Sequence, residues 1–307
     1  MKKILSIFLV LIALSCGCYA CNEEGNTPLH IASSYGDINK VKLLLEQGFD
    51  IDIQNDLDET PLYLACKNEH TQIVKLLLEH GANPNTKKYC GKTPIFAACK
   101  DNYVDVAKLL LKYGADVNVT SNRNTTPLLE LCSGWNANYD KNLELVKLLL
   151  AHRANANPKY CEDYGTPLFS AVKNNSYKVA ILLVEHGADP NTTLPDYLSK
   201  YILNYLCDSL TPWKCRTGKI KLIKSLLDHG ANVNGLSYLH TTPLFSACSH
   251  SAITTDINIV RILLKYGADV NIPADVGIPG CTEITPLQIA QENKNTKIVE
   301  LLLKYGA

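Results

Sequence analysis

The sequence predicts an all-α solenoid, in which eight helix-turn-helix repeats stack on one another. Three observations carry this prediction. A Thr-Pro-hydrophobic string recurs along the chain, and its first four copies start at a constant interval. A second string of the type VKLLLEHGAN follows each copy and occurs eight times. Glycine and then Asn or Asp close most units, which is turn chemistry at a fixed period.

The first string predicts the opening helix of each repeat. It begins at seven threonines: Thr27, Thr60, Thr93, Thr126, Thr166, Thr242 and Thr285. A degenerate eighth copy, Tyr201 to Cys207, lies in the long interval between Thr166 and Thr242. Threonine caps a helix by accepting a hydrogen bond from a first-turn amide, and proline fits the first helical position. The second string places leucines at helical spacing and predicts a second helix.

Together the two strings resemble the ankyrin repeat, over roughly residues 22–307. The resemblance implies stacked repeats with projecting β-hairpin loops, and a protein partner bound across a concave face of hairpin tips and first helices. The expected repeats are approximately 24–55, 56–86, 87–119, 120–157, 158–191, 192–234, 235–271 and 272–307. Stacking is required because ordering one such repeat alone costs roughly 50 kcal/mol, more than an isolated helix pair offsets.

Two departures from the family pattern carry predictions of their own. The family's histidine after Thr-Pro-Leu survives only as His30, so we expect aromatic packing to replace most of its hydrogen bonds. Arg153 stands where the closing glycine is expected. A non-glycine residue in the left-handed region costs roughly 1–2 kcal/mol, and we therefore expect a weak or altered turn there.

The N-terminal residues 1–21 are predicted to be a targeting segment. Two lysines precede an apolar stretch of eleven residues, which runs into small residues and cysteines. This is typical of a secretory signal peptide. The direct passage into Cys16 resembles a bacterial lipoprotein signal, which makes Cys16 the lipidation candidate, in competition with Cys18 and Cys21. An ordinary signal-peptidase cut and an uncleaved anchor remain open. We expect an exported protein: a cell-envelope lipoprotein, periplasmic or secreted.

Composition and motifs argue against several other classes of protein. Lys plus Arg and Asp plus Glu number 30 each, which argues against a nucleic-acid partner and against a polybasic membrane face. Membrane contact is expected only through the N-terminal lipid or anchor. The chain has no Gly-rich phosphate loop, HExxH or GxSxG string, so we expect no enzymatic activity, cofactor or metal. We also expect the protein to be a monomer. An enzymatic site in enlarged loops near Trp135 and Trp213 is a remaining alternative.

Five of the twelve cysteines share one repeat position, where the family often has alanine: Cys66, Cys99, Cys132, Cys207 and Cys248. A metal or redox ladder is one interpretation, and it gives the alternative function of a cysteine-based metal- or redox-buffering envelope protein. We favour small buried apolar residues, because helices stack about 8–10 Å apart and a disulfide needs Cα atoms within about 7 Å. Cys207 and Cys215, which flank one enlarged loop, are the pair to test for a disulfide.

Aligning the copies on their threonines gives the variable positions that point to the expected binding face. The predicted partner-binding residues are Asp56, Leu57, Glu59, Lys67, Tyr89, Lys92, Lys100, Asn122, Arg123, Asp163, Tyr238 and Leu239. Tyr and Arg are over-represented at energetic hot spots, so Tyr89, Arg123 and Tyr238 are the strongest candidates. For any single position, a solvated turn residue is the alternative. The predicted function is an exported, non-enzymatic scaffold that binds a protein of unknown identity.

Overall fold

The computed structural model describes residues 24–133, 142–159, 161, 165–193, 201–208, 216–237, 240–249, 257–275 and 283–307. The predicted targeting segment, with Cys16, lies outside these residues. The chain divides into two compact units. Unit 1 comprises residues 1–134 and 144–154, and unit 2 comprises residues 135–143 and 155–307.

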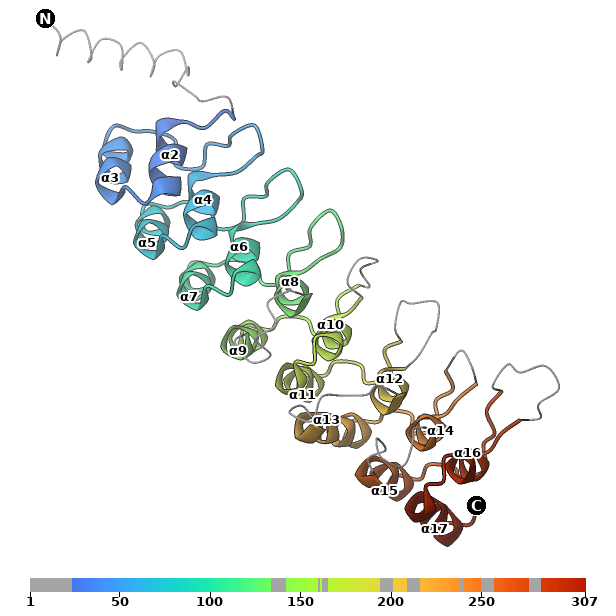
Figure 1. The fold of residues 1–307 in the computed structure, drawn as a ribbon. Helices are drawn as coiled ribbons and strands as arrows, with labels where there is room; N and C mark the ends of the chain where they lie inside the picture. The colour runs from blue at the N-terminus through green and yellow to red at the C-terminus, as the bar shows by residue number, and fades with distance from the viewer. Residues whose placement is uncertain are drawn as a thin grey trace, which may run out of the picture. The chain divides into compact units, whose positions relative to one another are not determined.

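The described part of each unit contains four pairs of helices, in which a short inner helix is followed by an outer helix (Figure 1). In unit 1 the pairs are α2 (Pro28–Tyr35) with α3 (Ile38–Glu46), α4 (Pro61–Lys67) with α5 (Thr71–Glu79), α6 (Pro94–Lys100) with α7 (Val104–Lys112), and α8 (Pro127–Ser133) with α9 (Leu143–Ala151). In unit 2 they are α10 (Pro167–Lys173) with α11 (Tyr177–Glu185), α12 (Ile202–Asp208) with α13 (Arg216–Asp228), α14 (Pro243–Cys248) with α15 (Ile257–Lys265), and α16 (Pro286–Glu292) with α17 (Thr296–Lys304).

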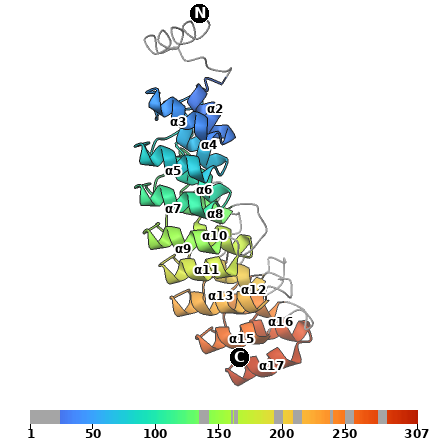
Figure 2. The same ribbon diagram turned by 90° about the vertical axis from the view of Figure 1, so that its left-hand side faces the viewer.

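Within each unit, successive pairs stack so that inner helices contact inner helices and outer helices contact outer helices (Figure 2). In unit 1 the inner row packs α2 on α4, α4 on α6 and α6 on α8. In unit 2, α12 packs on α14 and α14 on α16. The all-α solenoid of about eight paired-helix repeats is therefore confirmed.

The threonines begin the inner helices as expected. The hydroxyl of Thr60 accepts a hydrogen bond from the Tyr63 amide at 3.1 Å, and Thr242 accepts one from Phe245 at the same distance. Proline occupies the first turn in each of these helices. The first-turn amides would otherwise lack partners, so this local chemistry fixes where each inner helix starts. Side chains such as Leu62 are then fully buried between the helices.

The turn after each outer helix has one geometry, whichever residue occupies it. Gly81 has φ 90°, and the amides of Gly81 and Ala82 donate to the last helical turn at 3.1 and 3.0 Å. Arg153 has φ 65°, and the amides of Arg153 and Ala154 donate in the same way at 2.9 and 3.0 Å. The expected altered turn at Arg153 is therefore wrong in its geometry. The stacked repeat holds arginine in the left-handed conformation that glycine adopts elsewhere.

A row of asparagines, which we call the asparagine ladder, joins successive turns within each unit. At the first turn Asp52 takes this place and accepts from the Asn83 amide at 3.0 Å. The side-chain amide of Asn85 donates to the Gly114 carbonyl at 2.9 Å, and its oxygen accepts from the Asp116 amide at 2.7 Å. The members are Asn85, Asn118, Asn157, Asn191 and Asn234. Each bond spans about one repeat, so the ladder couples neighbouring repeats.

The loops between repeats are hairpin-like turns, and the described residues contain isolated bridges rather than extended strands. In unit 1 the Asn55 amide donates to the Glu59 carbonyl at 3.1 Å, and Lys88 donates to Lys92 at 3.0 Å. One backbone bond thus closes each loop at its base. In the part of the chain that the structure describes, no helix combines the length and the apolar character needed to cross a bilayer.

Candidate partner-binding surface

The hairpin tips of unit 1 are bonded to one another through their backbones. The Asp56 amide donates to the Glu24 carbonyl at 3.2 Å, and the Tyr89 amide donates to the Leu57 carbonyl at 3.2 Å. The Asn122 amide continues the row by donating to the Cys90 carbonyl on the preceding tip at 3.0 Å. These bonds hold successive tips in a fixed order, so that side chains distant in sequence lie side by side.

The tips and the inner helices together form one surface, which we call the unit 1 inner face. Its residues are Asp56, Leu57, Glu59, Lys67, Lys88, Tyr89, Lys92, Lys100, Asn122, Arg123 and Glu130. Nine of these were predicted from the sequence, and Lys88 and Glu130 were not. The nine predicted residues of unit 1 lie on its loops and on its inner helices, and their role in binding stays a prediction.

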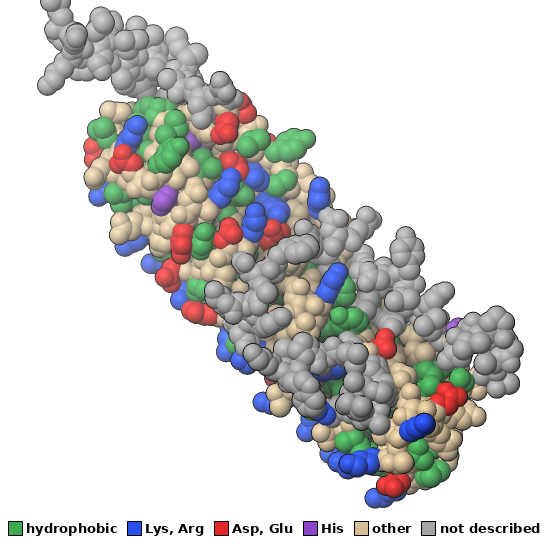
Figure 3. All heavy atoms as spheres, in the orientation of Figure 1, with side chains coloured by type: hydrophobic (Ala, Val, Ile, Leu, Met, Phe, Trp, Pro, Cys, Tyr) green, Lys and Arg blue, Asp and Glu red, His purple; other side chains and the backbone are tan. Residues whose placement is uncertain are grey.

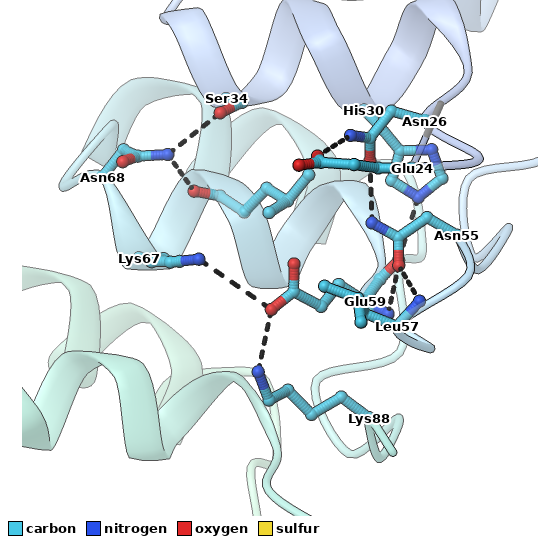
Figure 4. Close-up of polar contacts among 11 residues, drawn as sticks. Glu24, Asn26, His30, Ser34, Asn55, Leu57, Glu59, Lys67, Asn68 and Lys88 are labelled. Carbon is cyan, nitrogen blue, oxygen red and sulfur yellow. Dashed lines mark hydrogen bonds and ion pairs between the residues drawn. The ribbon is translucent and has the colours of Figure 1, made fainter. Parts of the chain in front are cut away.

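A buried carboxylate organises the lysines on this face (Figure 4). The side chain of Glu59 is only 4% exposed, and its Oε1 lies 2.8 Å from Lys88 Nζ and 4.0 Å from Lys67 Nζ. Lys88 also lies over the Tyr63 ring, 4.8 Å from its centroid. Glu59 was predicted to meet the partner directly. Its burial instead makes it the residue that positions two lysines.

A second contact between a lysine and a carboxylate lies one repeat further along, with the charges exchanged. Lys92 takes the position of Glu59 before its threonine, and Glu130 lies on α8. Lys92 Nζ donates to both carboxylate oxygens of Glu130, at 2.8 and 2.9 Å. It also lies over the Phe96 ring at 5.6 Å from the centroid. Both lysines are held by a carboxylate on one side and an aromatic ring on the other, which restricts their freedom before any partner arrives.

Two large apolar side chains stand out on the tips. Tyr89 is 79% exposed and Leu57 is 51% exposed. Large exposed apolar residues that lie together often mark an interaction site, whereas scattered ones do not. Because the Tyr89 amide donates to the Leu57 carbonyl, these two residues lie on adjacent tips.

The other predicted residues divide into two groups. Lys67 and Lys100 lie at the ends of α4 and α6 and are exposed, as are Asp56, Asn122 and Arg123 on the tips. Asp163, Tyr238 and Leu239 lie outside the described residues. In unit 2, Lys173 occupies the position equivalent to Lys67 and Lys100, and its Nζ lies 5.7 Å from the centroid of the Phe169 ring.

The base of the second hairpin is fixed by His30. The Thr27 amide donates to His30 Nδ1 at 3.1 Å, so the ring hydrogen is on Nε2, which donates to the Glu59 carbonyl at 2.9 Å. Burial lowers the pKa of His30, and the hydrogen bond to Glu59 opposes this only in part. The ring is therefore neutral near pH 7 and ties helix α2 to the loop that carries Glu59.

Unit 2 has a substitute for this histidine that the sequence pattern did not reveal. Asn204 lies in the degenerate repeat at the matching place, and its side-chain amide donates to the Gly235 and Thr241 carbonyls at 3.0 and 2.8 Å. The expectation that aromatic packing replaces the histidine holds at Phe96 and Phe169, which are buried. Asparagine supplies the hydrogen bonds in the one copy that lacks the Thr-Pro start.

The cysteines that share a repeat position are buried, as expected for small core residues. Burial raises the pKa of Cys66 and Cys99 far above the usual range, and it raises the pKa of Cys207 and Cys248 to about 12. Thiolates, which bind metals and react, are thus disfavoured at neutral pH. Among the described residues, no cluster of His, Cys, Asp and Glu could hold a metal. Cys215 lies outside them, so its pairing with Cys207 stays a prediction.

Comparison with known proteins defines the class to which this chain belongs. The family of Ankyrin repeats (3 copies) matches residues 2–88, 41–121, 120–193 and 207–274, and the single Ankyrin repeat matches residues 282–307. The chain belongs to the ankyrin-repeat family. Proteins of this family are in general non-enzymatic scaffolds for protein–protein interaction.

Among individual proteins, the chain is similar to an ankyrin repeat protein of Rickettsia bellii, with 37% identity over 52% of this chain and 70% of that protein. It is 30% identical to the ankyrin repeat protein YahD of Escherichia coli, over 54% of this chain and 92% of that protein. It is 28% identical to alpha-latrocrustotoxin-Lt1a of Latrodectus tredecimguttatus, of which it spans 10%. It spans under half of similar ankyrin proteins from fowlpox virus and Acanthamoeba polyphaga mimivirus, 44% and 46%.

Proposed function

We propose that this protein is an exported scaffold that binds a protein partner on the unit 1 inner face. The observation that carries the proposal is the row of bonded tips, which presents exposed Tyr89 and Leu57 beside ordered lysines. Rigid aromatic anchors next to fixed polar groups are what tight interfaces use, since little side-chain freedom is lost on binding. The buried thiols give no comparable support to a metal- or redox-buffering function.

Site-specific photocrosslinking tests the binding face. A photoreactive phenylalanine analogue replaces Tyr89 in the full chain, which is expressed in the cells that carry its gene. Leu43, on the outer helix α3 of the same unit and 52% exposed, is the matched control position. We expect one protein to be captured from position 89 and not from position 43. Equal capture from both positions, or none from position 89, contradicts this assignment.

Export is proposed on the pattern of residues 1–21 alone, with Cys16 as the lipid acceptor. Cell fractionation and mass spectrometry of the N-terminal peptide test it. We expect a mature chain that begins at or near Cys16 and carries lipid, and a Cys16→Ser variant that carries none. A cytosolic chain with Met1 still attached would contradict export, without touching the binding proposal.

A further inference from the structure

We propose that the partner of the unit 1 inner face is an acidic protein segment that also carries an apolar side chain. This inference rests on the proposed function and names the chemistry of its partner. It is argued first from four lysines on two neighbouring repeats: Lys67, Lys88, Lys92 and Lys100. Figure 3 shows lysine and arginine side chains gathered on this face of unit 1, over α4, α6 and their loops.

The net charge of the face indicates the sign of the partner's charge. The unit 1 inner face carries five cations, the four lysines and Arg123, and three carboxylates, Asp56, Glu59 and Glu130, so five minus three leaves an excess of two positive charges. Glu59 and Glu130 are already engaged by lysines at 2.8 Å and are largely buried.

Two of the lysines, Lys88 and Lys92, are held by a carboxylate and an aromatic ring before binding. Lys88 approaches Glu59 from the loop while Lys67 approaches the same oxygen from α4 (Figure 4). Burial is the largest single effect and lowers the pKa of Lys88, but the hydrogen bond to Glu59 and the electrostatic attraction of Tyr63 and Glu59 together outweigh it. The pKa is therefore raised, and Lys88 stays protonated. An ammonium group has three donors. One contact to Glu59 leaves donors for a partner carboxylate, and little side-chain freedom remains to be lost.

The apolar requirement comes from the tips above the lysines. Tyr89 and Leu57 lie on adjacent tips, and both are large and mostly exposed. A wholly charged segment would leave them in water. A segment with an aromatic or aliphatic residue among its carboxylates would cover them and meet the lysines at the same time.

Fluorescence anisotropy with synthetic peptides tests this inference on the full chain. The probe is a short labelled peptide of glutamates with a pair of phenylalanines, and the comparison peptides replace its glutamates with lysine or with serine. We expect the glutamate peptide alone to bind, and its affinity to fall as salt rises from about 0.05 to 0.5 M. Tighter binding of the lysine or serine peptide would overturn the inference. So would a single-stranded oligonucleotide that binds more tightly through the same lysines.

The repeat supplies a matched pair of double variants. Lys67 and Lys100 occupy equivalent positions of neighbouring repeats on the inner helices, and Lys42 and Lys75 do so on the outer helices α3 and α5. We expect Lys67→Ala with Lys100→Ala to weaken the glutamate peptide about tenfold or more, and Lys42→Ala with Lys75→Ala to leave it within about twofold. Circular dichroism confirms that both variants fold. Equal loss in the two would mean a response to net charge alone, and would refute the site.

Cys90 separates failure of this inference from failure of the proposed function. It is partly exposed on the tip beside Tyr89, whereas the other described cysteines are buried. Its alkylation by a maleimide, read at the Cys90 peptide by mass spectrometry, therefore reports cover of the face. We expect the glutamate peptide to slow alkylation. If the protein captured at position 89 slows it and the glutamate peptide does not, the acidic partner is wrong while the binding face stands.

Discussion

The outer turns and the inner tips of unit 1 make an instructive pair, because both recur in every repeat and both bond to their neighbours. At the outer turns, side chains make the bonds, as when Asn85 reaches the backbone of the next repeat at Gly114 and Asp116. At the tips the backbone makes a bond between each pair of neighbours, as between Tyr89 and Leu57, and the Asn122 side chain adds one further bond. The bonding side chain at these turns is asparagine in most repeats and Asp52 in the first, where its carboxylate accepts from the Asn83 amide at 3.0 Å. The side chains at the tips are more free to vary. Stability and recognition are thus assigned to different parts of the repeat.

The largest expected effect comes from breaking the asparagine ladder. Asn85→Ala removes one donor and one acceptor, each with a backbone partner in the next repeat, and we expect the free energy of unfolding to fall by about 1–2 kcal/mol. Asn122→Ala is the matched control at a tip, where the side chain donates to the Tyr89 carbonyl at 3.0 Å. Its loss should be at most about half as large, by urea denaturation. Equal losses of unfolding free energy would show that the turns and the tips contribute equally to stability.

Acidification should weaken the base of the second hairpin. The folded pKa of His30 lies below the ordinary value of 6.5, so the unfolded chain binds the proton more readily. This contribution to stability is present above pH 6.5 and is lost as the pH falls toward the folded pKa, by at most about 1.4 kcal/mol per pH unit. Thermal unfolding between pH 7.5 and 5 measures it.

The control for His30 already exists in the chain. Gln288 occupies the same place in the last repeat and accepts a hydrogen bond from the Thr285 amide at 2.8 Å. A His30→Gln variant keeps a donor and an acceptor but does not titrate, so its unfolding should depend less on pH over this range. An unchanged pH dependence in the variant would show that other groups cause it.

A smaller gain in stability is expected from Arg153→Gly. Arginine there has φ 65°, a conformation that costs a side chain roughly 1–2 kcal/mol. Glycine relieves this cost but loses more freedom on folding, so we expect a net gain of about 0.5–1 kcal/mol. Gly81→Ala, at an equivalent turn with φ 90°, should lose stability. A loss in Arg153→Gly would mean that the arginine side chain itself stabilises the turn.

The smallest effect should come from the tips. Leu57→Ser with Tyr89→Ser changes two mostly exposed side chains and no backbone bond. We expect the unfolding free energy to stay within about 0.5 kcal/mol while capture of the partner is lost. Destabilisation beyond about 1 kcal/mol would show that the tips carry stability as well as recognition.

Much of the fold could be predicted because its determinants are local. A threonine followed by proline sets a helix start within four residues, and a closing glycine sets its end, so the helix pairs follow from the string itself. The burial of Cys66 and its counterparts also follows from position. Arg153 shows where local reasoning fails. The cost of a left-handed arginine predicted an altered turn, but the packing of the repeat holds Arg153 in the same turn geometry as glycine.

The site could be predicted only as a set of tip positions. Alignment on the threonines identified Tyr89 and Lys67, but it also placed Glu59 on the surface and omitted Glu130 and Lys88. The bonds that decide these roles join residues 29 to 38 apart, from Glu59 to Lys88 and from Glu130 to Lys92. Their partners depend on how one repeat rests on the next. The sequence pattern of a single repeat cannot predict a contact between two repeats.

The ladder has a consequence for how such a chain grows. Each bond of the ladder runs from an asparagine side chain to main-chain atoms of the following repeat. It therefore does not depend on which side chains that repeat carries. The Asn118 rung reaches the carbonyl of Arg153 at 3.0 Å as readily as the Asn85 rung reaches that of a glycine at 2.9 Å. A duplicated or exchanged segment can therefore join the array at once, and its sequence is then free to diverge.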